Sequence, residues 1–403
     1  MGNTAQLAVT ELIKLLSDEE PIVRMAVAQA LGKIGNPQAV SPLIIALGDT
    51  DWRVRESAQL ALAKIGEPAL SELIKALSEN NPDVREGASY ALGFIESPQA
   101  IQSLITLLGD PILTVRETAE EALVNIGDEK VIGALKTEIE HEQNPMNRQY
   151  MSDVLKRMER RIEIRNEIRE TFHIEVVGRR GAQFSLDNME TILLILKSIP
   201  KELLSGLKTI KAETEEVLGP YVSGTVQSET ILMFVPTDHV GSLRHEIGHI
   251  IDKTFFGFKA FEQLHARSKF EEDYAWIYGA HNSQEDFATT IELYTLDTAA
   301  NFLRAINSAR EGKPIYLEKL LFVLDVFTAN FQDGRPAGAT TRMYQVADHM
   351  YGMTPNPRVL TKDVAVTRDN DGKIVKIGDV DVFKPDGSYN LDELEKFFSS
   401  LVF

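Results

Sequence analysis

The sequence contains no cysteine, no excess of basic residues and no long apolar run. A chain without cysteine forms no disulfides, thiolate zinc sites or iron–sulfur clusters, so any metal must be held by histidine and carboxylate side chains. The 403 residues include 42 Lys+Arg and 60 Asp+Glu, and the resulting net charge of -18 argues against a nucleic-acid partner. Because no stretch of about 18 apolar residues and no basic, apolar leader occurs, we expect no membrane partner and a cytoplasmic location.

An internal repeat runs through the first 160 residues. Four Val-Arg pairs recur at intervals of 31, 30 and 31 residues, each between two apolar blocks with helical spacing. This pattern is typical of helical hairpins, which bury their apolar faces only by stacking on one another. Three of the units end in a glycine, as a helix-ending cap requires. We therefore predict an all-α solenoid over residues 1–160, marked by Val23-Arg24, Val54-Arg55, Val84-Arg85, Val115-Arg116 and the glycines Gly35, Gly66 and Gly127.

These units resemble the short HEAT-like repeats first known from phycobilisome lyases, over about residues 5–128. The resemblance implies a HEAT-like solenoid that presents a protein-binding surface, so we expect a protein partner on the repeats. The arginine of each Val-Arg pair recurs at a fixed position, which is what a packing device needs. We expect these four arginines to form a structural ladder with backbone or acidic groups of adjacent repeats.

The pattern changes after residue 160. Residues 171–177, 207–212 and 223–235 are predicted strands and residues 186–199 a helix, which together indicate an α+β domain over residues 161–312. We expect the strand over residues 230–235 to form a sheet edge on which an extended peptide lies antiparallel. Residues 313–403 are predicted to form a C-terminal extension of helices and a hairpin, with its turn at residues 369–372.

The segment that bears on function is a His-Glu-x-x-His motif. His245 and His249 stand one helical turn apart, so both imidazoles project from one helix face and can bind one zinc ion at ~2.0 to 2.1 Å. Glu246 faces the same cavity and can take a proton from a water at the metal. A catalytic zinc ion needs three protein ligands and one open position, so a third ligand must come from a later segment.

We expect Glu285 to be that ligand, because Ser283 can cap a helix whose first turn then presents Glu285. The residues alone leave other assignments open. Asp286 and Glu292 are possible substitute ligands, and Asp252 could orient His249 or lie at a solvated helix end. Two further histidines could be ligands, substrate contacts or ordinary loop residues, namely His239 and His281.

Residues 244–252 and 278–294 resemble the catalytic domain of anthrax toxin lethal factor and the related Pro-Pro endopeptidases, and the match covers roughly residues 165–310. The resemblance implies a zincin-like metallopeptidase fold in which one zinc ion is bound by His245, His249 and Glu285. It also implies that Glu246 is the general base and that Tyr278, seven residues before Glu285, steadies the oxyanion. The sequence departs from the family at Thr289, where a second glutamate is frequent.

Taken together, these observations predict a zinc-dependent endopeptidase that hydrolyses a protein or peptide substrate, with its repeats recruiting a substrate or partner. The alternative is a non-catalytic interaction scaffold with a structural or degenerate metal site. A chromophore lyase is a third possibility, but it depends on the repeats alone and leaves the metal segment unexplained. Glu246 and Tyr278 discriminate between these possibilities, because a structural zinc site needs neither a base nor an oxyanion donor.

Overall fold

The computed structural model describes residues 2–178, 183–213, 224–234, 242–257, 261–269, 274, 281–328, 340–347, 358–369 and 373–401. The chain forms two compact units. The first consists of Met1–Glu163 and Arg179–Leu186, and the second of Ile164–Gly178 and Asp187–Phe403. Within the described residues, no helix is long and apolar enough to cross a membrane.

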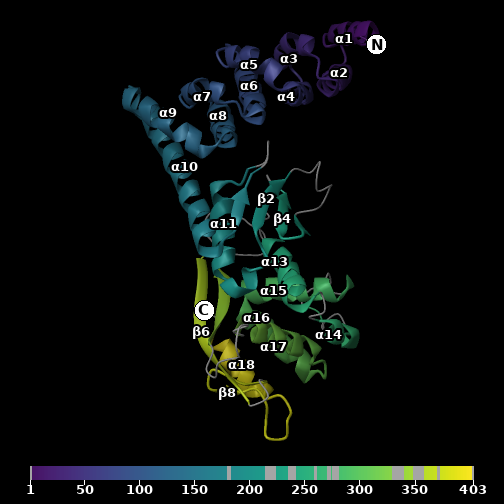
Figure 1. The fold of residues 1–403 in the computed structure, drawn as a ribbon, viewed down its shortest axis with the longest axis vertical. Coiled ribbons are helices and arrows are strands. Elements are labelled where there is room, and N and C mark those ends of the chain that lie inside the picture. Colours follow the sequence, from purple (N-terminus) through teal and green to yellow (C-terminus); the bar gives the residue numbers. More distant parts are fainter. Residues whose placement is uncertain are drawn as a thin grey trace. The chain divides into compact units, whose positions relative to one another are not determined.

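The first unit is a stack of helical hairpins, as the repeat period predicts (Figure 1). Asp51 and Asn81 cap their helices by accepting hydrogen bonds from the backbone N–H groups two residues later, and Pro21 and Pro82 open theirs. The 3-10 turns Pro37–Ala39, Glu67–Ala69 and Pro98–Ala100 precede α3, α5 and α7. The helices are α1 Gly2–Leu15, α2 Pro21–Ile34, α3 Val40–Ala46, α4 Trp52–Ile65, α5 Leu70–Ala76, α6 Pro82–Ile95, α7 Ile101–Leu107, α8 Leu113–Ile126, α9 Asp128–His141 and α10 Pro145–Phe172, whose last residues belong to the second unit.

One continuous apolar core runs through this stack. The same repeat position supplies a fully buried leucine in four successive units, Leu31, Leu62, Leu92 and Leu123. Gly32 allows α2 and α4 to approach closely, since a Cβ there would lie 2.6 Å from the Cα of Ala61. The apolar period therefore sets both the helices and the core that joins them.

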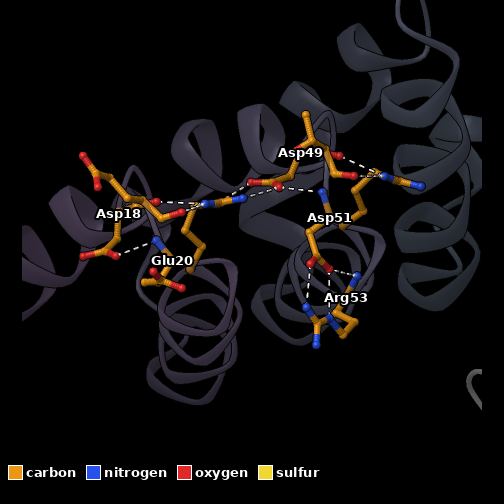
Figure 2. Close-up of polar contacts among 9 residues, drawn as sticks. Asp18, Glu20, Asp49, Asp51 and Arg53 are labelled. Carbon is orange, nitrogen blue, oxygen red and sulfur yellow. Dashed lines mark hydrogen bonds and ion pairs between the residues drawn. The ribbon is translucent and has the colours of Figure 1, made fainter.

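The predicted arginine ladder is confirmed. The Arg24 guanidinium forms two 2.7 Å hydrogen bonds to the Asp49 carboxylate and donates to the carbonyl of Asp18 (Figure 2). Further along the stack, Arg85 makes the same paired contact with Asp110, at 2.7 and 3.0 Å. Arg55 donates to the Asp49 carbonyl and Arg116 to the Asp110 carbonyl, so each of these two acceptor loops is bound by arginines from two successive units.

The second unit begins with a four-stranded sheet in the order β1-β2-β4-β3, flanked by helices (Figure 1). Strands β1, β2 and β4 are parallel, and β3 pairs antiparallel with β4. The prediction that residues 230–235 form the sheet edge is wrong, because β4 lies between β2 and β3; among the described strands, β1 and β3 are at the two edges. The elements are β1 Glu175–Val177, α11 Leu186–Lys197, η4 Lys201–Leu204, β2 Thr209–Glu213, β3 Gly224–Gln227, β4 Thr230–Phe234, α13 Leu243–Ile251, η6 Asp252–Phe256 and α14 Glu262–Arg267.

The predicted strand over residues 171–177 is shorter than expected. Residues 171 and 172 end α10, and only Glu175–Val177 forms β1. The helix continues because the long charged run before residue 171 has its own strong helix preference, which outweighs two β-favouring residues at its end.

Four helices and a second sheet complete the described part of the unit. The sheet has the order β5-β6-β7-β8 and is antiparallel throughout. Pairing of β6 with β7 confirms the predicted hairpin, although residues 370–372 of its turn lie outside the described part of the chain. The elements are α15 Ser283–Leu296, α16 Thr298–Arg310, α17 Ile315–Thr328, β5 Thr340–Ala347, β6 Arg358–Arg368, β7 Ile374–Ile377, β8 Val380–Asp381 and α18 Leu391–Ser399.

Candidate metal centre

Helix α13 carries His245, Glu246 and His249. Its apolar residues Leu243 and Ile247 are fully buried, which fixes the orientation of the helix and leaves both histidines only partly covered. The two imidazoles meet edge to face, with 3.2 Å between their Nε2 atoms. The spacing of four residues thus brings two nitrogen donors together, as expected.

Helix α15 presents the third donor, Glu285, from its first turn. The predicted cap at Ser283 is wrong by one residue. The side chain of Asn282 caps the helix by accepting hydrogen bonds from the backbone N–H groups of Gln284 and Glu285, both at 3.0 Å. An asparagine before the helix fulfils the same requirement as a serine, and the first turn is unchanged.

Helices α13 and α15 lie next to each other (Figure 1), and a glycine allows their close approach. A Cβ on Gly248 of α13 would lie 2.6 Å from the Cα of Ala288 on α15, closer than real Cβ atoms come to backbone. Gly248 is therefore required at a backbone contact between the helix with the two histidines and the helix with Glu285. Sequence reasoning missed this role, although the signal, a glycine inside the motif, was present.

The three donor atoms form a small triangle. Oε2 of Glu285 lies 3.0 Å from Nε2 of His245 and 3.4 Å from Nε2 of His249. Ligands bound at ~2.0 to 2.1 Å around a tetrahedral ion lie about 3.3 Å from one another. His245, His249 and Glu285 are the group of this kind found among the described residues, and they could hold one metal ion.

Charge within the triangle favours cation binding. The imidazoles of His245 and His249 lower the pKa of Glu285 to about 2. Burial acts to lower the pKa of His245, but the carboxylates of Glu285 and Glu292 outweigh burial and raise that pKa to about 9. Because the pKa of the His245 imidazole is raised, metal binding must displace the proton that this imidazole holds.

Glu246 is not part of the donor triangle. Its side chain is buried, and burial raises its pKa above the ordinary value, while the positive charge of the two histidines acts in the opposite direction. The edge strand β3 passes close by, since a Cβ on Gly224 would lie 3.2 Å from Cγ of Glu246. The Glu246 side chain therefore packs, through its Cγ, against the start of β3.

The remaining candidates separate clearly. Asp286 is not placed as a ligand, because its carboxylate pairs with the fully buried ammonium of Lys319 at 2.7 Å and with His265 at 3.2 Å. Glu292 faces Nδ1 of His245 rather than the triangle. Asp252 is fully buried, which excludes a solvated helix end, and His281 is exposed just before α15. Tyr278 and His239 lie outside the described residues.

Comparison with known proteins identifies the repeats. A family model for HEAT repeats matches residues 9–71 and 70–155. The phycocyanobilin lyase subunit alpha of Picosynechococcus sp. is 34% identical over 143 residues, which cover 30% of this chain and 53% of that protein. The phycocyanobilin lyase subunit alpha of Nostoc sp. is 33% identical over 153 residues, which cover 33% of this chain and 55% of that protein. The chain thus spans about half the length of these two relatives.

A third relative, the phycocyanin operon protein Z of Pseudanabaena tenuis, is 32% identical over 147 residues, which cover 33% of this chain and 71% of that protein. The chain is a mostly helical HEAT-repeat protein with small sheets in its C-terminal part. Through the residues that match protein Z it belongs to the family of that protein, and its repeats match the HEAT-repeat model. The zincin-like fold and the peptidase activity stay predictions, because the matched family model ends at residue 155.

Two solved structures have partial likeness to the chain. The complex of CpcE and CpcF of phycocyanin lyase from Nostoc sp. matches 37% of this chain and 98% of its own at 24% identity, with a TM-score of 0.27. The match to human deoxyhypusine hydroxylase in complex with glycerol covers 81% of this chain and 98% of that chain at 16% identity, with a TM-score of 0.30. At these scores neither structure carries an argument about function.

Proposed function

We propose that the protein is a zinc-dependent endopeptidase whose HEAT repeats recruit a protein substrate or partner. The observation that carries the proposal is the donor triangle of His245, His249 and Glu285. The neighbouring residue Glu246 is buried and is not one of the three donors. Three protein donors are typical of a catalytic zinc site, whereas a structural site uses four. A buried carboxylate that is not a ligand is what a hydrolytic site needs as a base.

The chemistry divides among these residues. A zinc ion held by the triangle supplies Lewis-acid chemistry when bound, since it lowers the pKa of water and polarises a carbonyl. Burial raises the pKa of Glu246. The Glu246 carboxylate would accept a proton from the attacking water and pass it to the leaving amine. Tyr278, on the resemblance to the lethal factor family, donates its hydroxyl hydrogen bond to the charge that develops on the substrate oxygen.

The edge strand indicates how a peptide would bind. β3 is the antiparallel edge of the sheet, and Gly224 at its start lies against Glu246. Among the described strands β3 has no partner on its outer side, and an extended peptide that pairs with it there would lie near the Glu246 side chain, with main-chain hydrogen bonds supplying affinity. This placement replaces the predicted one on β4 and makes an extended peptide the substrate class.

The comparisons favour a second candidate, a protein-interaction scaffold in which the metal site has no catalytic role. The matched family model covers repeats alone, and two of the relatives are by name subunits of a phycocyanobilin lyase. A role like that of a lyase subunit would use the repeats and would leave the donor triangle and Glu246 without a function. Either candidate includes a protein partner on the repeats.

The experiment that separates the candidates is cleavage of a peptide library by the zinc-loaded protein and by Glu246→Gln. We expect the variant to bind zinc and keep its fold while losing cleavage, because it keeps the size of the side chain and removes the base. Glu262→Gln, on the exposed face of α14, is the matched control and should cleave normally. Cleavage by Glu246→Gln would refute its role, and a zinc-loaded wild type that cuts no peptide would support the scaffold.

A further inference from the structure

The imidazole of His245, on α13, lies between two carboxylates that both belong to α15. Its Nε2 is 3.0 Å from Oε2 of Glu285, and its Nδ1 is 3.6 Å from Oε2 of Glu292. The two glutamates are seven residues apart on α15, which is about two helical turns, so both side chains project from one face. The ring therefore has a carboxylate of one rigid element, α15, facing each of its nitrogens.

The two nitrogens have different partners and hence different roles. Nε2 of His245 faces Glu285 and Nε2 of His249, so it is the atom that belongs to the donor triangle. A neutral imidazole that binds a metal through one nitrogen carries its proton on the other. That proton, on Nδ1, points to the side where Glu292 lies.

We propose that Glu292 is a positioning residue that accepts a hydrogen bond from Nδ1–H of His245 and thereby fixes the ring for metal binding. The inference depends on the metal site in the proposed function but not on peptide cleavage. The 3.6 Å separation exceeds a hydrogen bond by a few tenths of an ångström, so the proposal requires a small rotation of the ring or of the carboxylate when the metal binds. Carboxylates in this position make the imidazole more basic and fix its tautomer.

The surrounding helix explains why Glu292 has this role. Position 289, one turn after Glu285, is a buried threonine and offers no carboxylate. Glu292 supplies the carboxylate from the following turn, and its side chain is only 21% exposed, so solvent weakens its interaction with the ring less than at the surface. Asp286, the other acid near Glu285, is already paired with Lys319 and His265.

The test is zinc affinity, measured by competition with a chelator, for the full-length wild type, Glu292→Gln and the control Glu262→Gln. We expect Glu292→Gln to bind zinc about 10- to 100-fold more weakly, as loss of such a partner does elsewhere, and the control to match the wild type. An unchanged zinc affinity in Glu292→Gln overturns the inference.

A spectroscopic measurement excludes a merely structural effect. In the zinc-loaded wild type, labelled at histidine nitrogens, the Nδ1–H proton of His245 should resonate downfield because a carboxylate accepts it. Glu292→Gln should shift that resonance upfield, while the resonances of His249 stay in place. If Glu292→Gln does not fold, Glu292→Asp gives the same readout with a longer separation, and an unmoved His245 resonance refutes the inference.

These measurements also separate this inference from the proposed function. Zinc affinity and the His245 resonance are both read without a substrate. A protein that binds zinc with the predicted dependence on Glu292 and cleaves nothing would refute the endopeptidase and support the positioning role.

Discussion

Gly248→Ala tests the packing on which the donor triangle depends. The added Cβ would lie 2.6 Å from Cα, 3.1 Å from Cβ and 3.2 Å from the carbonyl oxygen of Ala288. Favourable contacts between carbon atoms begin at about 3.5 Å, so α13 and α15 must separate by roughly 1 Å. Backbone of a neighbouring helix cannot move aside as the end of a flexible side chain can, and overpacking of this kind costs about 1 to 3 kcal/mol.

The separation acts on two edges of the triangle. It lengthens the 3.0 and 3.4 Å distances from Glu285 to the histidines and leaves the 3.2 Å distance within α13 unchanged. Without metal the helices relax apart, whereas zinc binding must pull them back against the strain. If the full strain of about 1 to 3 kcal/mol opposes binding, zinc affinity falls by about fivefold to about a hundredfold.

The assay is a zinc titration with a competing chelator, together with thermal unfolding with and without zinc. Gly133→Ala in α9 is the matched control, since nothing lies within 4 Å of a Cβ there, and it should bind zinc normally and be slightly more stable. We expect Gly248→Ala to lose most of the stabilisation that zinc gives the wild type. Wild-type zinc affinity in Gly248→Ala would refute the close approach of the two helices.

Three further predictions concern the surroundings of the site and the repeats. Lys319→Met leaves the buried carboxylate of Asp286 without its ammonium partner and should destabilise the second unit by about 3 to 5 kcal/mol, read by denaturant unfolding; equal stability would contradict the ion pair. The Arg24 guanidinium lowers the pKa of Asp49. The pair therefore stabilises the folded protein at pH values above the ordinary pKa of an aspartate, and this stabilisation is lost as the pH falls through the lowered pKa. The excess stability of the wild type over Asp49→Asn should therefore shrink on acidification, and an excess independent of pH would contradict the ladder. A chelator should lower the melting temperature of zinc-loaded protein and added zinc should restore it, while no response would count against a bound ion.

The repeats could be predicted from the sequence because their signal is periodic and local. The spacing of Leu31, Leu62, Leu92 and Leu123 fixes both the helices and the core, and the ladder follows from one arginine per unit. Small errors arose where two local preferences compete, as at residues 171 and 172, where helix continues past the start of a β-favouring run.

The second unit was predictable only in part. The pairing of His245 with His249 follows from helix geometry alone, and the structure brings Glu285 to them, although its role as a ligand stays a prediction. Strand order could not be read from the chain, because the sequence places residues 230–234 last before α13 whereas pairing makes β3 the edge. The contact of Gly248 with Ala288 and the position of Glu292 depend on how two helices pack, which one sequence does not reveal.

The most direct test of the central claim is metal content. Wild type and Glu285→Ala would be equilibrated with zinc, dialysed against buffer with a weak chelator, and analysed for ions per chain by elemental analysis. Convergence of His245, His249 and Glu285 on one cation predicts one zinc per wild-type chain and close to none in the variant. Equal zinc in both proteins, or none in the wild type, would contradict the account.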